Sequence, residues 1–182
     1  EPTSTVAVTI EDEEGNTIGP VAATVNPDGT WTIPDQDFGG LEDGPITVGM
    51  VGNWNYIKGQ ERFVRAVAGL RDRLQRDVRG VLIGRVLDNH KAHFDAVMEE
   101  ARALGIPDSL EIRGFDPNPR EAMATFDLQF LPSHSEACPM SVLEAMSVGV
   151  PVVAFDVGGV REQLERDGKP AGIVVPNGDC EA

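Results

Sequence analysis

Two carboxylates flank a stretch of the sequence that has the pattern of a helix start near residue 139. Glu136 lies in a loop, and Glu144 falls in the second helical turn if the helix begins at Pro139, a residue suited to the first helical position. A helix N-terminus holds phosphate on its backbone N–H groups, and carboxylates accept hydrogen bonds from sugar or ribose hydroxyls. One interpretation of this segment is therefore a site for phosphate together with a sugar or a ribose.

A second interpretation of the same segment involves no ligand. The run Ser141-Val142-Leu143-Glu144 fits a capping box, in which Ser141 and Glu144 satisfy backbone N–H groups at the helix start. The spacing leaves both interpretations open. A glycosidase would need two carboxylates facing one another across a cleft, and nothing in this sequence requires that arrangement.

A second loop whose residue types suit ligand binding runs from Gly52 to Gly59, between a predicted strand and a predicted helix. Gly52 allows close backbone approach, and Lys58 carries a mobile positive charge that suits a phosphate. The loop is neither a complete P-loop nor a GxGxxG motif, so a solvated surface lysine is the alternative interpretation. Trp54 and Tyr56 fit either a cap on the core or a stacking surface for a ligand.

Both loops belong to a region in which strand and helix patterns alternate. Six short apolar runs have the character of strands, and most are followed by segments with helical spacing; the runs are Ile46–Val51, Val78–Ile83, Leu110–Arg113, Asp127–Leu131, Pro151–Phe155 and Gly172–Val175. This order predicts an α/β fold with a doubly wound, Rossmann-like parallel sheet of about six strands. Ligands of such sheets bind at the carboxyl ends of the strands, where both loops lie.

The first 45 residues differ in charge from the rest of the chain. They hold ten acidic residues and no Lys or Arg, whereas the other 137 residues hold 20 acidic and 15 basic ones. The runs Val6–Ile10, Val21–Val25 and Trp31–Ile33 predict short strands. We expect an acidic β-rich extension over residues 1–45 and an α/β domain over residues 46–182.

Composition narrows the classes of function. With 182 residues and a net charge of −15, the chain has no broad basic surface for nucleic acid or anionic lipid. No apolar run reaches the length of a membrane span, and no targeting segment is visible at Glu1-Pro2-Thr3. Two cysteines cannot form a disulfide framework, and His90 and His93 lack a nearby third ligand, so no metal site is predicted. A reduced, cytoplasmic setting is expected.

The segment from Val48 to Asp179 contains a series of short motifs. The most specific are Pro132-Ser133, Glu136, Leu143-Glu144-Ala145-Met146, Gly149, Pro151–Ala154, Gly158-Gly159 and Glu162. Others are Val51-Gly52, Lys58-Gly59, Leu82-Ile83-Gly84, Ile112, Gly114-Phe115 and Gly172–Pro176. In these motifs and their order, the segment resembles the C-terminal, nucleotide-sugar-binding domain of retaining GT-B glycosyltransferases. Residues 1–45 separately resemble part of a bacterial immunoglobulin-like adhesin module.

The resemblance implies a role for each matched site residue. Lys58, after Gly52, would bind the donor diphosphate, and Glu144 would bind the ribose. Glu136 would contact the transferred sugar. The backbone near sugar and phosphate would come from Cys138, Pro139, Met140 and Ser141, and the loop at Gly114 and Phe115 would border the base. The family needs no bound metal or other cofactor for this, because positive side chains and a helix terminus stabilise the leaving group.

The sequence also departs from the family pattern. Asn53 stands where the family usually has an arginine, and Ala137-Cys138-Pro139 is bulkier than the usual glycine-containing loop. By this resemblance a whole enzyme would also have an N-terminal domain that binds the acceptor, and we expect residues 46–182 to be its C-terminal half, truncated at its C-terminus.

We therefore expect the chain to be the donor half of a retaining glycosyltransferase, which moves a hexose from a nucleoside diphosphate sugar to an acceptor hydroxyl. The donor half by itself is expected to be inactive. The full-length enzyme could be peripheral to the membrane. Two alternatives remain: a non-catalytic assembly module that forms oligomers through the N-terminal β-rich arm, and a fusion fragment.

Overall fold

The computed structural model describes residues 5–11, 17–25, 31–32, 45–166 and 169–177. The chain divides into two compact units, residues 1–44 and residues 45–181. In the first unit, β1 (Thr5–Glu11), β2 (Thr17–Val25) and β3 (Trp31–Thr32) form an antiparallel sheet in the order β1-β2-β3. Three predicted strands are therefore present, although Ile33 lies outside the described residues. Three strands do not make a two-sheet sandwich, so the immunoglobulin-like resemblance stays a prediction.

The second unit is built on a six-stranded parallel sheet, which confirms the predicted fold class. Its strands are β4 (Ile46–Val51), β5 (Val78–Ile83), β6 (Leu110–Arg113), β7 (Leu128–Leu131), β8 (Val152–Phe155) and β11 (Ile173–Val175), in the order β11-β8-β7-β4-β5-β6. The register places Val48 opposite both Gly80 and Leu128. Near-continuous apolar runs are what strands covered on both faces require.

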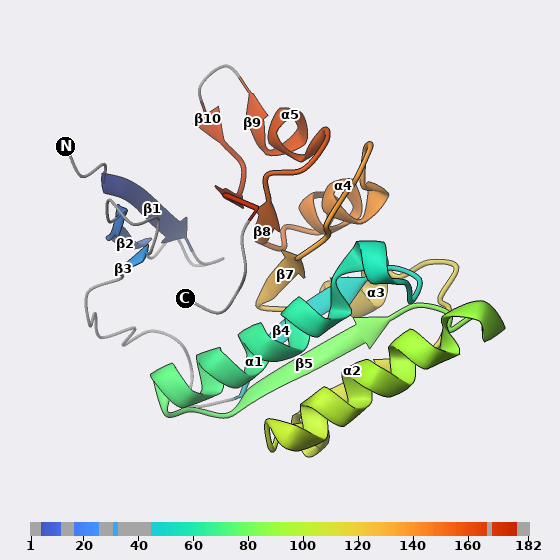
Figure 1. Ribbon diagram of the computed structural model, residues 1–182. Helices are drawn as coiled ribbons and strands as arrows, with labels where there is room; N and C mark the ends of the chain where they lie inside the picture. Colours follow the sequence, from blue (N-terminus) through green and yellow to red (C-terminus); the bar gives the residue numbers. More distant parts are fainter. Residues whose placement is uncertain (1–4, 12–16, 26–30, 33–44, 167–168, 178–182) are drawn as a thin grey trace. The chain divides into compact units, whose positions relative to one another are not determined.

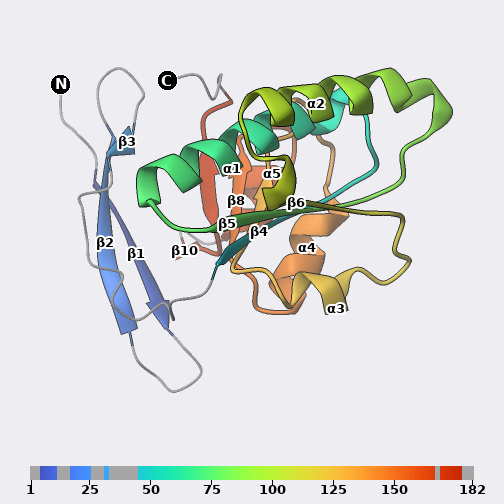
Figure 2. The same cartoon turned by 90° about the horizontal axis from the view of Figure 1, so that it is seen from below.

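Helices cover the two faces of this sheet, α1 and α2 on one side and α3 and α4 on the other (Figures 1 and 2). The helices are α1 (Gln60–Leu74), α2 (Lys91–Ala103), α3 (Arg120–Met123), α4 (Met140–Ser147) and α5 (Val160–Leu164), with 3₁₀ turns η1 (Tyr56–Lys58), η2 (Asp88–His90) and η3 (Pro107–Ser109). The apolar spacing predicts a helix over residues 60–76; α1 is present but ends at Leu74, and its Phe63, Val64 and Val67 are fully buried. The helical spacing of the sequence predicts a helix over residues 160–166, but α5 ends at Leu164, because β9 (Glu165–Arg166) pairs with β10 (Lys169–Pro170).

Two aromatic residues of the first loop have different positions in the fold. Trp54 is buried in the core, where its ring meets that of Phe94 edge to face at a centroid distance of 4.7 Å. Tyr56 is 63% exposed. The interpretation of Trp54 as a cap on the core is therefore correct, whereas Tyr56 presents its ring at the surface.

The strand order creates a switch point between β4 and β7. From β4 the chain moves outward through β5 to β6, returns to β7 on the other side of β4, and continues outward through β8 to β11. In sheets of this kind, ligands bind in the crevice outside the carboxyl ends of the strands where the direction of winding changes. The loops that follow β4 and β7 are the two loops singled out from the sequence.

Candidate functional site

An open cleft of about 530 Å³ lies at the carboxyl ends of the sheet strands. Nine of the ten residues predicted to form a site line it: Gly52, Lys58, Phe115, Glu136, Cys138, Pro139, Met140, Ser141 and Glu144. The tenth, Gly114, precedes Phe115 and does not line the cleft. The fold thus gathers residues from the loops after β4, β6 and β7 and from the start of α4.

An ion pair joins the two central loops inside this cleft. Lys58 Nζ lies 2.7 Å from Glu136 Oε1, and the Ser133 hydroxyl donates a hydrogen bond of 2.6 Å to the same oxygen. The Glu136 side chain is only 8% exposed, compared with 25% for Lys58. The sequence indicated Lys58 and Glu136 separately, but it did not indicate their pairing or the part played by the buried Ser133.

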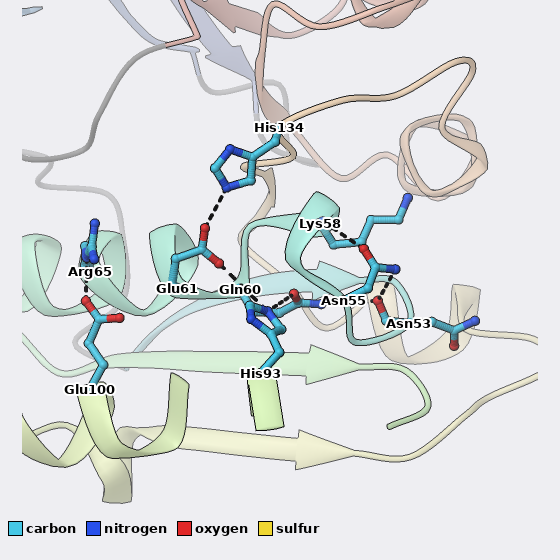
Figure 3. A network of polar contacts seen from close by, with 9 residues as sticks. All are labelled: Asn53, Asn55, Lys58, Gln60, Glu61, Arg65, His93, Glu100 and His134. Carbon is cyan, nitrogen blue, oxygen red and sulfur yellow. Dashed lines mark hydrogen bonds and ion pairs between the residues drawn. The ribbon is translucent and has the colours of Figure 1, made fainter. Parts of the chain in front are cut away.

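The local structure of the first loop sets the position of Lys58. The Asn55 side chain accepts a hydrogen bond of 3.2 Å from the Lys58 backbone N–H, and this bond caps the 3₁₀ turn η1 (Figure 3). Gly59 then adopts a φ of 73°, in the left-handed region. A Cβ at Gly59 would come within 2.2 Å of the Pro132 carbonyl oxygen, so glycine lets the loops after β4 and β7 meet.

The start of α4 differs from the capping-box interpretation. The helix begins at Met140, its N-cap is Pro139, and no side chain makes a cap hydrogen bond there. Ser141 and Glu144 therefore occupy the second and fifth helical positions, whereas a capping box needs the N-cap and the third. Pro139 also lies one position earlier than predicted. Within the described part of the chain, the Glu144 carboxylate has no hydrogen-bond or ion-pair partner, and it faces the cleft.

Two further residues shape the rim near β5. The Asn53 side chain accepts a hydrogen bond of 3.0 Å from the Arg85 backbone N–H, so it fastens the loop after β5 to the loop after β4. The Arg85 guanidinium lies 4.8 Å from the centre of the Phe115 ring, which is 57% exposed. A guanidinium over an aromatic face in this way is attracted by the ring, so the contact restrains Phe115 at the edge of the cleft. Neither contact could be inferred from spacing.

A second polar cluster lies outside the cleft, where α1 begins (Figure 3). His134 Nε2 is 2.7 Å from Glu61 Oε1, and His93 Nε2 is 3.1 Å from Gln60 Oε1. Burial lowers the pKa of His93 from its ordinary value, and the neighbouring His90 and His134 lower it further, whereas Glu61 acts in the opposite direction.

The lowered pKa of His93 predicts that the domain loses stability on acidification. As pH falls through the ordinary value of 6.5, His93 in the unfolded chain takes up a proton before the folded one does, which favours unfolding. We expect the difference in unfolding free energy between pH 7.5 and pH 5.5, measured with urea, to be smaller in His93→Gln than in the wild type. An equal difference in both proteins would contradict this role of His93.

The described residues include no group of three or more His, Cys, Asp or Glu side chains placed to hold a metal ion. Among the helices described, none combines the length and apolar character that are needed to cross a bilayer.

Comparison with known proteins places the chain in a family. The family model described as "Glycosyl transferases group 1" matches residues 33–182. This chain belongs to that family. The match begins twelve residues before the change in charge at Pro45, and it contains the whole cleft.

Curated relatives of this group 1 glycosyltransferase domain include enzymes with different stated activities. A lipopolysaccharide core biosynthesis mannosyltransferase, LpsB of Rhizobium meliloti, is 29% identical over 79% of this chain and 40% of its own length. A 2-deoxystreptamine glucosyltransferase of Streptomyces kanamyceticus is 32% identical over 77% of this chain and 37% of its own length. The chain therefore spans about two fifths of these relatives.

Solved structures of GT-B glycosyltransferases share the fold of about three quarters of this chain. Anabaena Alr3699/HepE in complex with UDP and glucose superposes with a TM-score of 0.67 at 26% identity, covering 74% of this chain and 35% of that one. The complex of the same protein with UDP-glucose gives a TM-score of 0.67 over 75% of this chain and 36% of that one. The predicted resemblance of the α/β region to GT-B glycosyltransferases is therefore confirmed.

Proposed function

We propose that this chain is the donor-binding half of a retaining glycosyltransferase, which transfers a hexose from a nucleoside diphosphate sugar to an acceptor hydroxyl. One observation carries the proposal: a cleft at the switch point holds the Lys58–Glu136 pair, the start of α4 and Glu144, whose carboxylate has no partner among the described residues. A nucleoside diphosphate sugar offers what these groups recognise, namely two phosphates, a ribose and a second sugar.

Each group in the cleft has a separate task in this proposal. Lys58 and the first backbone N–H groups of α4 bind the diphosphate, since cations and a helix N-terminus both favour anions. Glu144 accepts hydrogen bonds from the ribose, and Glu136 accepts them from the transferred sugar. Phe115, beside Gly114, borders the base. UDP and UDP-glucose in the HepE complexes are ligands of this chemical class.

Electrostatics is the main catalytic contribution that this half can make. Breaking the bond between sugar and diphosphate places growing negative charge on the departing phosphate, and Lys58 and the α4 terminus stabilise it without a metal or other cofactor. Transfer also needs an acceptor hydroxyl held in line, and a relative that is about twice as long as this chain has room for a domain that does so. We therefore propose that this chain binds donor but does not turn over alone.

Nucleotide titration followed by amide NMR tests the proposal. UDP, GDP and ADP are titrated separately into the wild type and Glu144→Ala. For the nucleotide that fits, we expect saturable shifts at residues 52–59 and 136–144. Loss of a charged hydrogen-bond acceptor for ribose should weaken binding about tenfold or more in Glu144→Ala.

Glu121→Ala is the matched control, because Glu121 is an exposed carboxylate on α3 that does not line the cleft. It should bind nucleotide as the wild type does. If the folded protein shows no amide shifts with any of the three nucleotides at millimolar concentration, the donor-binding proposal is overturned. That result would favour the non-catalytic assembly module. Equal losses in Glu144→Ala and Glu121→Ala would overturn the role of Glu144.

A further inference from the structure

Glu61, the second residue of α1, is a partly buried carboxylate that lies outside the cleft and contacts the loop after β7. Its side chain is 16% exposed, and its Oε1 lies 2.7 Å from His134 Nε2. Because an ionised carboxylate only accepts hydrogen bonds, the hydrogen of this contact belongs to His134. The second oxygen, Oε2, is buried without a hydrogen-bond partner in the described residues and lies 3.9 Å from His93 Nε2. A partly buried carboxylate satisfied through one oxygen depends strongly on that contact.

His134 is held by three contacts that all come from the α1 side of the loop. Besides the bond to Glu61, its backbone N–H donates to the Ile57 carbonyl at 2.8 Å, and its ring stacks on Tyr56 at a centroid distance of 4.4 Å. Figure 3 shows the His134 ring pointing toward Glu61 and away from Lys58. The side chain of His134 therefore contacts residues outside the cleft, whereas its neighbours Ser133 and Glu136 form the charged contact inside it.

The neighbours of His134 are the residues that complete the charged pair of the cleft. Ser133 precedes it, and Glu136 follows two positions later. The Ser133 hydroxyl donates to Glu136 Oε1 at 2.6 Å, and Lys58 Nζ donates to the same oxygen at 2.7 Å. Consecutive Cα atoms are fixed at 3.8 Å, so a displacement of His134 moves Ser133 directly and Glu136 through one intervening residue.

The residue before Glu61 holds the other loop in the same way. Gln60 is 1% exposed, and its amide nitrogen donates to the Asn53 carbonyl at 3.3 Å, in the loop after β4. Its amide oxygen accepts from His93 Nε2 of α2. Two adjacent residues at the start of α1 thus contact the loops on the two sides of the switch point: Gln60 the loop after β4 and Glu61 the loop after β7.

We propose that Glu61 is a positioning residue that holds Ser133 and Glu136 within reach of Lys58 through its hydrogen bond to His134. The structure itself gives the geometry of the Lys58–Glu136 pair. The consequence of this positioning for the transferred sugar rests on the proposed function. Glu61 touches no residue of the cleft lining directly in this role, so its effect on the cleft passes through the His134 backbone.

Three variants at pH 8 test this positioning role. Glu61→Ala removes the acceptor for His134, whereas Glu61→Gln keeps an acceptor oxygen at the same distance along the side chain. Glu100→Ala is the matched control, because Glu100 makes a comparable bond from α2 to Arg65 of α1, at 2.5 Å, without touching the loop after β7. Denaturation in urea establishes that each variant is folded.

The first readouts use the protein without nucleotide. In Glu61→Ala we expect amide hydrogen exchange at His134 to accelerate about tenfold or more. We also expect the Lys58 ammonium signal in ¹⁵N NMR, visible while its hydrogens are held by Glu136, to be lost. Glu61→Gln should restore both readouts, and Glu100→Ala should leave both unchanged. The inference is overturned if Glu61→Ala leaves both unchanged, or if Glu100→Ala has the same effect.

The last readout compares UDP with UDP-glucose in calorimetric titrations. A positioning role lowers the extra affinity that glucose adds in Glu61→Ala, whereas a purely structural role lowers the affinity for both ligands by the same factor. Absence of binding by the wild type would contradict the proposed function, and the exchange and ammonium readouts would still decide the role of Glu61. Equal factors for both ligands, with unchanged free-protein readouts, would overturn the positioning role.

Discussion

Replacing Lys58 by methionine is expected to weaken UDP binding about 10- to 100-fold. Lys58 is the cation of the Lys58–Glu136 pair in the cleft, and a charge-assisted hydrogen bond to phosphate contributes about 1.5–3 kcal/mol. Methionine keeps most of the length and apolar stem of the side chain but removes the charge. Isothermal titration calorimetry of UDP into the wild type and the variant measures the loss.

The same substitution has a second effect through Glu136. In Lys58→Met the Glu136 carboxylate, 8% exposed, keeps the Ser133 hydroxyl, 2.6 Å away, as its one hydrogen-bond partner among the described residues. An uncompensated, largely buried charge destabilises a fold by about 3–5 kcal/mol, and the partial exposure of Lys58 reduces the expected loss to about 1–3 kcal/mol. The unpaired carboxylate also repels an incoming diphosphate.

This repulsion can be tested by asking whether removal of the Glu136 charge raises the UDP affinity of Lys58→Met. Glu136→Gln added to Lys58→Met removes the repelling charge, so the double variant should bind UDP more tightly than Lys58→Met alone. Lys91→Met is the control, since Lys91 pairs with Asp95 on the exposed face of α2 and should leave UDP affinity unchanged. If the double variant binds no better than Lys58→Met, the two side chains do not act on the phosphate site as a charged pair.

The sequence predicted most of the fold because its signals are local. Apolar runs such as Ile46–Val51 and Val78–Ile83 are long enough to mark strands, and the apolar spacing along Gln60–Leu74 marks a helix. The strand order is not local, since it depends on which strand β7 joins after the chain leaves β6. The predicted end of α5 was wrong for a related reason. The sequence of Glu165–Arg166 continues the helical spacing, but these residues adopt an extended backbone because they pair with Lys169–Pro170.

The site was predictable where motif residues carry it, and not where contacts between distant residues do. Glu136 and Lys58 were both indicated, yet they are 78 positions apart and only the fold pairs them. Glu61 and His134, 73 positions apart, gave no signal that would connect them. The spacing of Ser141 and Glu144 fitted a cap and a ligand site equally well, and the position of the first turn of α4 decided against the cap.

Gly158→Ala is expected to destabilise the domain by about 2–5 kcal/mol and to disturb the loop that carries Glu136. Gly158 has a φ of 54°, and a Cβ there would lie 1.6 Å from the Glu136 carbonyl oxygen. Real Cβ contacts stay above 3.0 Å, so the backbone of Glu136 must move. Left-handed strain in a residue with a Cβ contributes about 1–2 kcal/mol, and overpacking against an unyielding neighbour adds about 1–3 kcal/mol.

Gly105→Ala separates these two contributions. Gly105 also has a positive φ, 68°, but a Cβ there would meet nothing within 4 Å. It should therefore lose only the strain, about 1–2 kcal/mol, and keep its UDP affinity. Urea denaturation and UDP titration of both variants measure the difference. If Gly158→Ala destabilises no more than Gly105→Ala and binds UDP as well, the loop after β7 yields freely, and close packing against Gly158 does not hold Glu136 in the cleft.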